Sequence, residues 1–277
     1  MDTVISRDGT SIAYEQVGQG PPLILVDGAF CSRAFGPMPK LAPLLARHFT
    51  VIFYDRRGRG DSGDTAPYAV AREVDDLDAL IRRAGGSAQV LGISSGAILA
   101  LEAAASSLPI ARLALYEPPF VATGDADHRV PPDSVAHLTR LIAADRRDAA
   151  VKFYLTRFMG APRIAYYGMR LMPQWPKMRA VAPSLPYDAT IVGDARPPRE
   201  RLATVAVPTL VIGGAKSPAG LRAAVHAAVD VIPGAQLHVL PGQTHNVAVT
   251  ALAPVVTAYF ARSSGARPVP VSSMPAR

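Results

Sequence analysis

Cysteine is almost absent from this chain of 277 residues, which contains only Cys31. A single thiol excludes a disulfide framework and any cysteine-based zinc site. The first nine residues lack the basic and apolar regions of a secretory signal. The uncharged stretch at 85–101 is interrupted by glycine and serine and is too short for a good membrane span. We therefore expect a cytoplasmic protein that makes no use of a membrane.

Acidic residues are scarce toward the C-terminus, where residues 201–277 carry six basic side chains but only one acid, Asp230. The whole chain has a net charge of +7. Its only tight basic cluster is residues 56–59, which follow an apolar run and lead into Asp61 and Asp64. Nucleic-acid binding favours basic and aromatic side chains gathered on one face. We therefore expect no nucleic-acid partner.

Apolar residues are plentiful, at 49% of the chain, so a large core can form. Short apolar runs alternate with segments of helical periodicity, a pattern typical of a parallel sheet with crossover helices. The predicted strands cover residues 3–6, 11–16, 23–26, 51–54, 89–93, 113–116, 209–212 and 236–240. The predicted helices cover residues 35–47, 70–84, 95–105, 219–229 and 247–261.

The alternation stops between residues 118 and 200, where helical segments are separated by prolines. We interpret this segment as a helical cap over the active face of the sheet. The core domain is then formed by residues 1–117 and 201–262. Residues 263–277 are rich in proline and serine and predict a flexible tail.

The strongest motif is the G-x-S-x-G pattern at residues 92–96, which lies between a predicted strand and a predicted helix. This arrangement holds a serine on a sharp strand-to-helix turn, where its neighbours must be small. The hydroxyl of Ser94 then projects at the positive end of the helix dipole. A tight turn without catalysis is the alternative, but the flanking strand and helix favour Ser94 as a nucleophile.

A general base is expected on the loop after the last strand, and His245 lies there. Of the other histidines, His226 lies in a predicted helix, His238 in a predicted strand and His128 and His137 in the cap, while His48 precedes a strand at the inactive edge of the sheet. His245 is therefore the candidate base.

The acid that orients such a histidine usually follows the strand at 209–212, but the loop at 213–217 contains no carboxylate. Asp230 is predicted at the opposite edge of the sheet. Glu117, at the carboxyl end of the strand at 113–116, is the favoured triad acid because a carboxylate at a buried strand end needs a partner. Asp125 and Asp127 remain the alternatives.

Backbone N–H groups are expected to form the oxyanion hole. Ser95, which follows the nucleophile, supplies one donor, and Ala29 or Gly28 supplies the other. The carboxylate of Asp27 would repel an oxyanion unless it points away.

These residues resemble those of the α/β-hydrolase superfamily over residues 1 to 262. The segment 55–62 is similar to the D-x-R-G-x-G-x-S turn of that superfamily. The resemblance implies an α/β fold with a mostly parallel eight-stranded sheet, flanking helices and an inserted helical cap. Asp27 replaces the usual histidine of the oxyanion loop.

Within the superfamily, the chain resembles the zearalenone lactonases in three places: residues 27–28, the elbow at 94–97, and the strand end at 117–119. In those lactonases a glutamate after this strand is the triad acid, a role that the resemblance carries to Glu117.

The expected reaction is cleavage of a carboxylic ester or lactone through an acyl-enzyme, without metal or cofactor. The substrate is expected to be a small hydrophobic molecule, bound by a pocket of Trp175, Phe30, Ile93, Phe120, Tyr154 and Phe158. C–C bond hydrolysis, lyase chemistry, cofactor-free oxygenation and non-catalytic ligand binding stay open, because a fold does not fix a reaction. A homodimer also stays open.

Overall fold

The computed structural model describes residues 1–120 and 130–261. Its centre is an eight-stranded sheet with the order β1-β2-β4-β3-β5-β6-β7-β8. Strand β2 pairs antiparallel with both of its neighbours, β1 and β4, and the other pairings are parallel. The strands are β1 (Asp2–Ile5), β2 (Ser11–Val17), β3 (Pro22–Val26), β4 (Thr50–Tyr54), β5 (Ala88–Ile93), β6 (Ile110–Tyr116), β7 (Thr209–Gly214) and β8 (Gln236–Leu240). The predicted fold class is confirmed.

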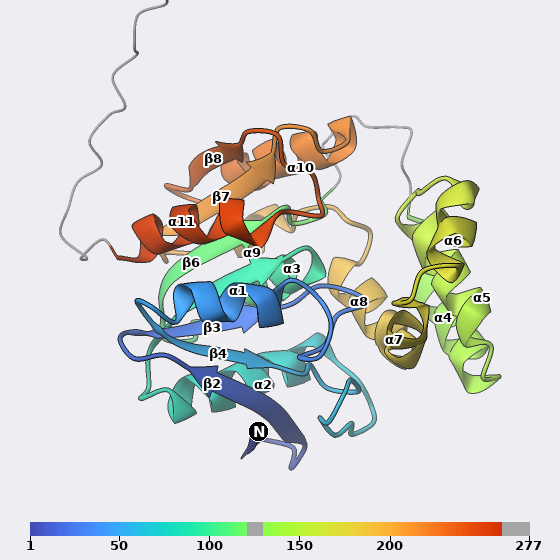
Figure 1. Cartoon of the computed structure of the whole chain (residues 1–277), viewed down its shortest axis with the longest axis horizontal. Coiled ribbons are helices and arrows are strands. Elements are labelled where there is room, and N and C mark those ends of the chain that lie inside the picture. Colours follow the sequence, from blue (N-terminus) through green and yellow to red (C-terminus); the bar gives the residue numbers. More distant parts are fainter. Residues whose placement is uncertain (121–129, 262–277) are drawn as a thin grey trace, which may run out of the picture.

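Helices cover both faces of the sheet (Figure 1). Two helices, α1 (Met38–Leu45) and α11 (Val249–Phe260), pack on one face. The other face is covered by α2 (Val70–Arg83), α3 (Ser95–Ala105) and α10 (Ala219–Val231). Successive strand residues alternate between these faces, so Val90 packs toward α3 and Leu91 toward α1. Burial on both faces explains why the central strands are continuously apolar.

Strand β7 extends beyond its predicted end. Gly213 and Gly214 were expected in a loop, since two adjacent glycines are typical of a turn. In the structure both residues pair with β8, and Gly214 lies opposite Leu240. This pairing carries the strand two residues further toward the candidate site.

The segment between β6 and β7 contains a group of helices that Figure 1 shows beside the sheet, with α8 lying nearest to it. Several of its prolines begin helices: Pro176 and Pro186 lie in the first turns of α7 and α8. The elements are α4 (Ser134–Ala143), α5 (Arg147–Phe153), the π-helical turn η1 (Tyr154–Phe158), α6 (Arg163–Arg170), α7 (Trp175–Ala180), the 3₁₀ turn η2 (Ala182–Ser184), α8 (Leu185–Val192) and α9 (Arg199–Leu202).

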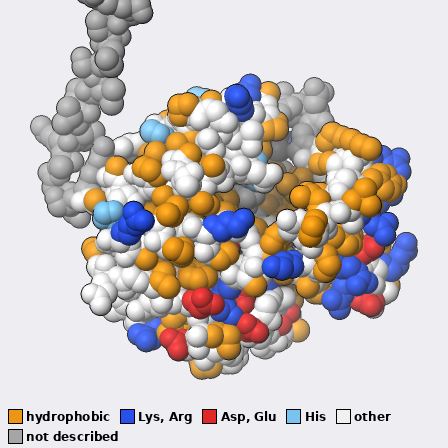
Figure 2. Space-filling model, viewed as in Figure 1, with side chains coloured by type: hydrophobic (Ala, Val, Ile, Leu, Met, Phe, Trp, Pro, Cys, Tyr) orange, Lys and Arg blue, Asp and Glu red, His pale blue; other side chains and the backbone are white. Residues whose placement is uncertain are grey.

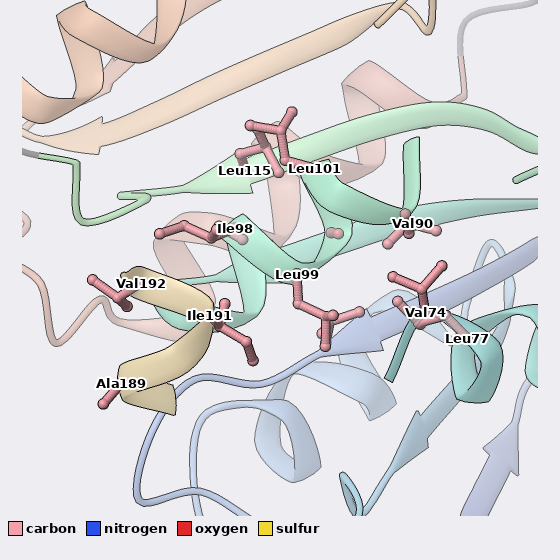
Figure 3. Close-up of a cluster of buried hydrophobic side chains, with 14 of the residues drawn as sticks. Val74, Leu77, Val90, Ile98, Leu99, Leu101, Leu115, Ala189, Ile191 and Val192 are labelled. Atoms are coloured by element: carbon pink, nitrogen blue, oxygen red, sulfur yellow. The ribbon is translucent and has the colours of Figure 1, made fainter. Parts of the chain in front are cut away.

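Helix α8 joins this segment to the sheet domain. Its residues Ile191 and Val192 belong to the same buried cluster as Ile98 of α3, and Figure 3 shows them side by side. Helix α6 instead carries exposed apolar side chains, among them Ile164. Figure 2 shows hydrophobic side chains gathered on the surface of the segment between β6 and β7. Within residues 1–120 and 130–261, no helix is long and apolar enough to cross a membrane. The predicted tail lies outside the described residues.

Candidate active site

Ser94 occupies a strained turn between β5 and α3. Its backbone angles are φ 56° and ψ −126°, a conformation that residues other than glycine rarely adopt. A Cβ on Gly92 would lie 2.5 Å from the Gly96 carbonyl oxygen, and one on Gly96 would lie 2.4 Å from that of Val26. Both distances are too short for any side chain. The two glycines therefore allow the close backbone approach that sets Ser94 at the end of the strand.

Glu117 and His245 meet at the carboxyl ends of β6 and β8. The Oε2 atom of Glu117 lies 2.8 Å from Nδ1 of His245. The Tyr116 hydroxyl donates to the Thr244 carbonyl at 2.6 Å and fixes the loop that carries the histidine. The Ser94 N–H donates to the Tyr116 carbonyl at 2.9 Å, which places the serine beside the same strand end. The structure thus brings together the three residues predicted from the sequence.

The last residue of β7 and the loop that follows it, which contains no acid, hold the carboxylate of Glu117. Oε1 accepts hydrogen bonds from Gly214 N–H at 2.7 Å and from Ser217 Oγ at 2.5 Å. Neither donor was predicted from the sequence. A signal for them was present, because a stretch of glycine and serine at the position usual for the triad acid offers hydrogen-bond donors to a carboxylate from elsewhere.

These donors keep Glu117 ionised although it is fully buried. Burial alone raises the pKa of a carboxyl group. Hydrogen bonds from His245, Ser217 and Gly214 outweigh burial and hold the pKa of Glu117 below its ordinary value. A buried anion at Nδ1 favours the imidazole tautomer whose Nε2 can accept a proton.

The loop after β3 lies against the nucleophile. A Cβ on Gly28 would lie 3.0 Å from the Ser94 Cβ, so only glycine fits there without displacement. The Gly28 N–H already donates a hydrogen bond to Asp27 Oδ1 at 3.0 Å. Ala29 is therefore the better candidate for the second oxyanion donor. Ser95, the other expected donor, is the first residue of α3.

Asp27 is buried beside this loop, and its Oδ2 has no hydrogen-bond partner among the described residues. Burial is the main cause that raises the pKa of Asp27 to about 6.

Four of the six predicted pocket residues share one buried cluster: Phe30, Phe120, Tyr154 and Phe158. The Phe30 ring meets Tyr154 edge-on at 5.4 Å, and Tyr154 stacks on Phe158 at 4.7 Å. These contacts tie the π-helical turn η1 to the loop after β3.

The other two predicted pocket residues differ from each other. Ile93 belongs to the cluster on the opposite face of the sheet. Trp175 begins α7 and is only partly buried, but it packs against the same cluster as the first four, and its ring meets Tyr166 of α6 at 5.6 Å.

The basic cluster at 56–59 is internal. Arg56, Arg57 and Arg59 are almost completely buried, and each guanidinium group is hydrogen bonded to a carboxylate. Their partners come from α2 and α8, namely Glu73, Asp76 and Asp188. These arginines therefore cannot bind an external phosphate in this fold.

Two further observations complete the site. The alternative acids, Asp125 and Asp127, lie outside the described residues. Within the part of the chain that the structure describes, no group of three histidine, cysteine or acidic residues is arranged to hold a metal ion.

The fold and this geometry agree with comparisons to known proteins. The alpha/beta hydrolase family matches residues 23–258. The chain therefore belongs to the alpha/beta hydrolase family.

Individual relatives are consistent with this membership. The solved structure of an alpha/beta hydrolase from Sphaerobacter thermophilus DSM 20745 is 50% identical, with a TM-score of 0.88, over 94% of this chain and all of that one. A hydrolase from Pseudomonas aeruginosa PA01 is 26% identical, with a TM-score of 0.72, over 94% and 98% of the two chains. The pimeloyl-[acyl-carrier protein] methyl ester esterase of Xanthomonas campestris pv. campestris (strain B100) is 29% identical over 233 residues, which are 83% of this chain and 89% of the relative.

Proposed function

We propose that this protein is a serine hydrolase that cleaves a carboxylic ester or lactone through an acyl-enzyme. Ser94 is the nucleophile, His245 the general base and Glu117 the residue that orients the base. The observation that carries the proposal is the 2.8 Å contact between Glu117 and His245 Nδ1, at the strand end to which Ser94 is bonded. The contact leaves Nε2 of His245 available for the serine proton.

In the first half of the reaction, Ser94 Oγ attacks the carbonyl carbon while His245 takes its proton. The tetrahedral oxyanion accepts hydrogen bonds from the backbone N–H groups of Ser95 and Ala29. When the intermediate collapses, His245 returns the proton to the departing alcohol oxygen, and the acyl group remains on Ser94. In the second half, His245 takes a proton from water, whose oxygen attacks the acyl-enzyme carbonyl. When this second intermediate collapses, the bond to Ser94 Oγ breaks, His245 returns the proton to that oxygen, and the carboxylic acid is released.

A small hydrophobic substrate suits the aromatic wall that Phe30, Tyr154 and Phe158 build beside the loop after β3. The methyl ester esterase relative supports ester cleavage as the reaction class. We extend the proposal to lactones because the residues that resemble the zearalenone lactonases all lie in this site.

Hydrolysis of p-nitrophenyl esters of increasing acyl length, followed by absorbance, tests the proposal. Ser94→Ala and His245→Ala are expected to lose activity by at least about 10³-fold, because each removes a member of one catalytic unit. Ser87→Ala and His226→Ala, changes of the same type at exposed positions, serve as matched controls and should keep full activity.

Activity that survives Ser94→Ala would show that hydrolysis does not proceed through an acyl-enzyme on Ser94. A wild-type protein that neither hydrolyses nor is acylated by any of these esters would exclude the esterase assignment. The non-ester chemistries named above would then have to be tested.

A further inference from the structure

One buried carboxylate outside the proposed triad is bonded directly to one half of the proposed oxyanion hole and through an arginine to the other half. Asp188 lies in α8 and is fully buried. Its Oδ1 accepts a hydrogen bond from Ser95 Oγ at 2.7 Å. Ser95 is the residue whose backbone N–H is proposed as the first oxyanion donor. Asp188 thus holds this residue by its side chain at the first position of α3.

The same carboxylate binds two arginines, one of which reaches the second donor loop. Asp188 Oδ2 accepts from Arg59 Nη2 at 2.5 Å, and Oδ1 accepts from Arg56 Nη1 at 2.7 Å. Arg59 Nη1 in turn donates to the carbonyls of Gly28 at 2.6 Å and Cys31 at 3.1 Å. These two carbonyls flank Ala29, the proposed second donor. The carboxylate and Arg59 therefore fix the loop on both sides of that residue.

The charges in this network are balanced inside the protein. Burial alone would raise the pKa of Asp188, but the charges of Arg59 and Arg56 outweigh it and hold the pKa below its ordinary value. An ionised, multiply bonded group is expensive to bury and contributes little net stability compared with apolar packing. Its geometric effect is strong, because each charged hydrogen bond restricts the position of its partner.

A second buried ion pair provides a comparison. Arg57 and Asp76 are both fully buried and form two hydrogen bonds. The remaining partners of Arg57 are Asp8 and the Arg72 carbonyl, neither of which belongs to the candidate site. Burial of an arginine and aspartate pair is therefore common to both networks. Contact with the donor residues occurs only in the network of Asp188.

We infer that Asp188 is a positioning residue for the oxyanion hole, which it holds in register by bonding Ser95 directly and the Gly28–Cys31 loop through Arg59. It makes α8, and with it the helical segment between β6 and β7, a structural part of the catalytic centre. The inference rests on the proposed function. An oxyanion hole stabilises charge only where its donors are fixed before the reaction, and small displacements reduce the rate strongly.

The test compares Asp188→Asn and Ser95→Ala with Asp76→Asn as the matched control. For each protein we would measure kcat and KM with p-nitrophenyl butyrate and the Ki of an alkyl trifluoromethyl ketone. The ketone forms a hemiketal with the nucleophilic serine, and its oxyanion occupies the hole. Asp188→Asn is expected to lower kcat by about tenfold to a hundredfold and to raise the ketone Ki by a similar factor, with KM within about twofold. Ser95→Ala should show the same pattern at about threefold to tenfold.

Asp76→Asn should lower the melting temperature and leave kcat and Ki unchanged, because its network does not reach the donors. Ser95→Ala keeps both ion pairs, so it decides the question if Asp188→Asn fails to fold. Unchanged kcat and Ki in Ser95→Ala, with Asp188→Asn unfolded or altered in stability alone, would overturn the positioning role. Wild-type protein that neither turns over the ester nor binds the ketone would instead refute the proposed function.

Discussion

Replacement of Glu117 by glutamine tests the orientation of His245 with almost no change of volume. The orientation of the new amide is dictated by the structure. Gly214 N–H and Ser217 Oγ both donate to Oε1, so the carbonyl oxygen of the amide must face them. The NH₂ group then faces Nδ1 of His245. Nδ1 must accept that hydrogen bond, which leaves the proton of the neutral imidazole on Nε2.

This tautomer cannot take a proton from Ser94, because Nε2 already carries one. The same kind of change in a serine protease triad, from a carboxylate to an amide with the geometry kept, lowers kcat about 10⁴-fold. We expect a loss of that size here, about 5.5 kcal/mol in activation free energy. The KM for the ester should change little, because Glu117 contacts His245 Nδ1 and has no direct role in binding the ester in the proposed mechanism.

The assay is steady-state hydrolysis of p-nitrophenyl butyrate at pH 7, with circular dichroism to confirm folding. Glu102→Gln is the matched control, since this residue lies on α3 and pairs with Arg201 away from the site. A folded Glu117→Gln enzyme within tenfold of wild type would refute the tautomer argument. The aspartates at 125 and 127 would then become the alternative acids to mutate.

Three further predictions concern stability. Gly96→Ala should fail to fold or lose all activity, because its Cβ would lie 2.4 Å from the Val26 carbonyl oxygen, as expression and thermal melting would show. Ser217→Ala removes a hydrogen bond to the ionised Glu117 and should cost about 1.5–3 kcal/mol of unfolding free energy at pH 7. Because the pKa of Glu117 is lowered by folding, its contribution is present above its unfolded pKa and is lost as the pH falls through the folded value, so the deficit in urea denaturation should shrink at acid pH. Folding raises the pKa of Asp27 to about 6. Its contribution to stability is therefore complete below its unfolded pKa and is lost as the pH rises through 6, a loss of about 3 kcal/mol expected from this group alone. Asp27→Asn should therefore flatten the pH dependence of the melting temperature between about pH 4 and pH 8, and an equally steep profile in the variant would disprove this origin.

The sheet and its helices were largely predictable because their signals are local. Helix α3 and strand β8 have the predicted bounds, since a glycine-flanked turn and a turn-bounded apolar run define them. The helices between β6 and β7 could not be bounded in advance. Proline is tolerated in the first turn of a helix and disfavoured further in, although α1 and α11 contain the internal prolines Pro43 and Pro254. A proline in the sequence therefore does not show whether a helix begins, continues or ends there.

Within the site, the sequence pointed to the proposed catalytic residues but not to most of the groups that hold them in place. Ser94 follows from a motif and Glu117 from its place at a strand end. The contacts from Gly214 and Ser217 to Glu117 join residues about a hundred positions apart and arise only when β6 and β7 pair. Asp188 is similar, since its bond to Ser95 spans 93 positions and depends on how α8 docks on α3.

Formation of an acyl-enzyme on Ser94 can be measured by rapid mixing of the protein with p-nitrophenyl butyrate. We expect a burst of nitrophenolate approaching one equivalent per active site, and a butyryl mass increment of about 70 Da on the peptide that contains Ser94 in acid-quenched samples. The burst and the increment should both vanish in Ser94→Ala. Linear release of nitrophenolate without a burst, under conditions where deacylation limits turnover, would contradict an acyl-enzyme mechanism. A butyryl group on any other residue would contradict Ser94 as the nucleophile.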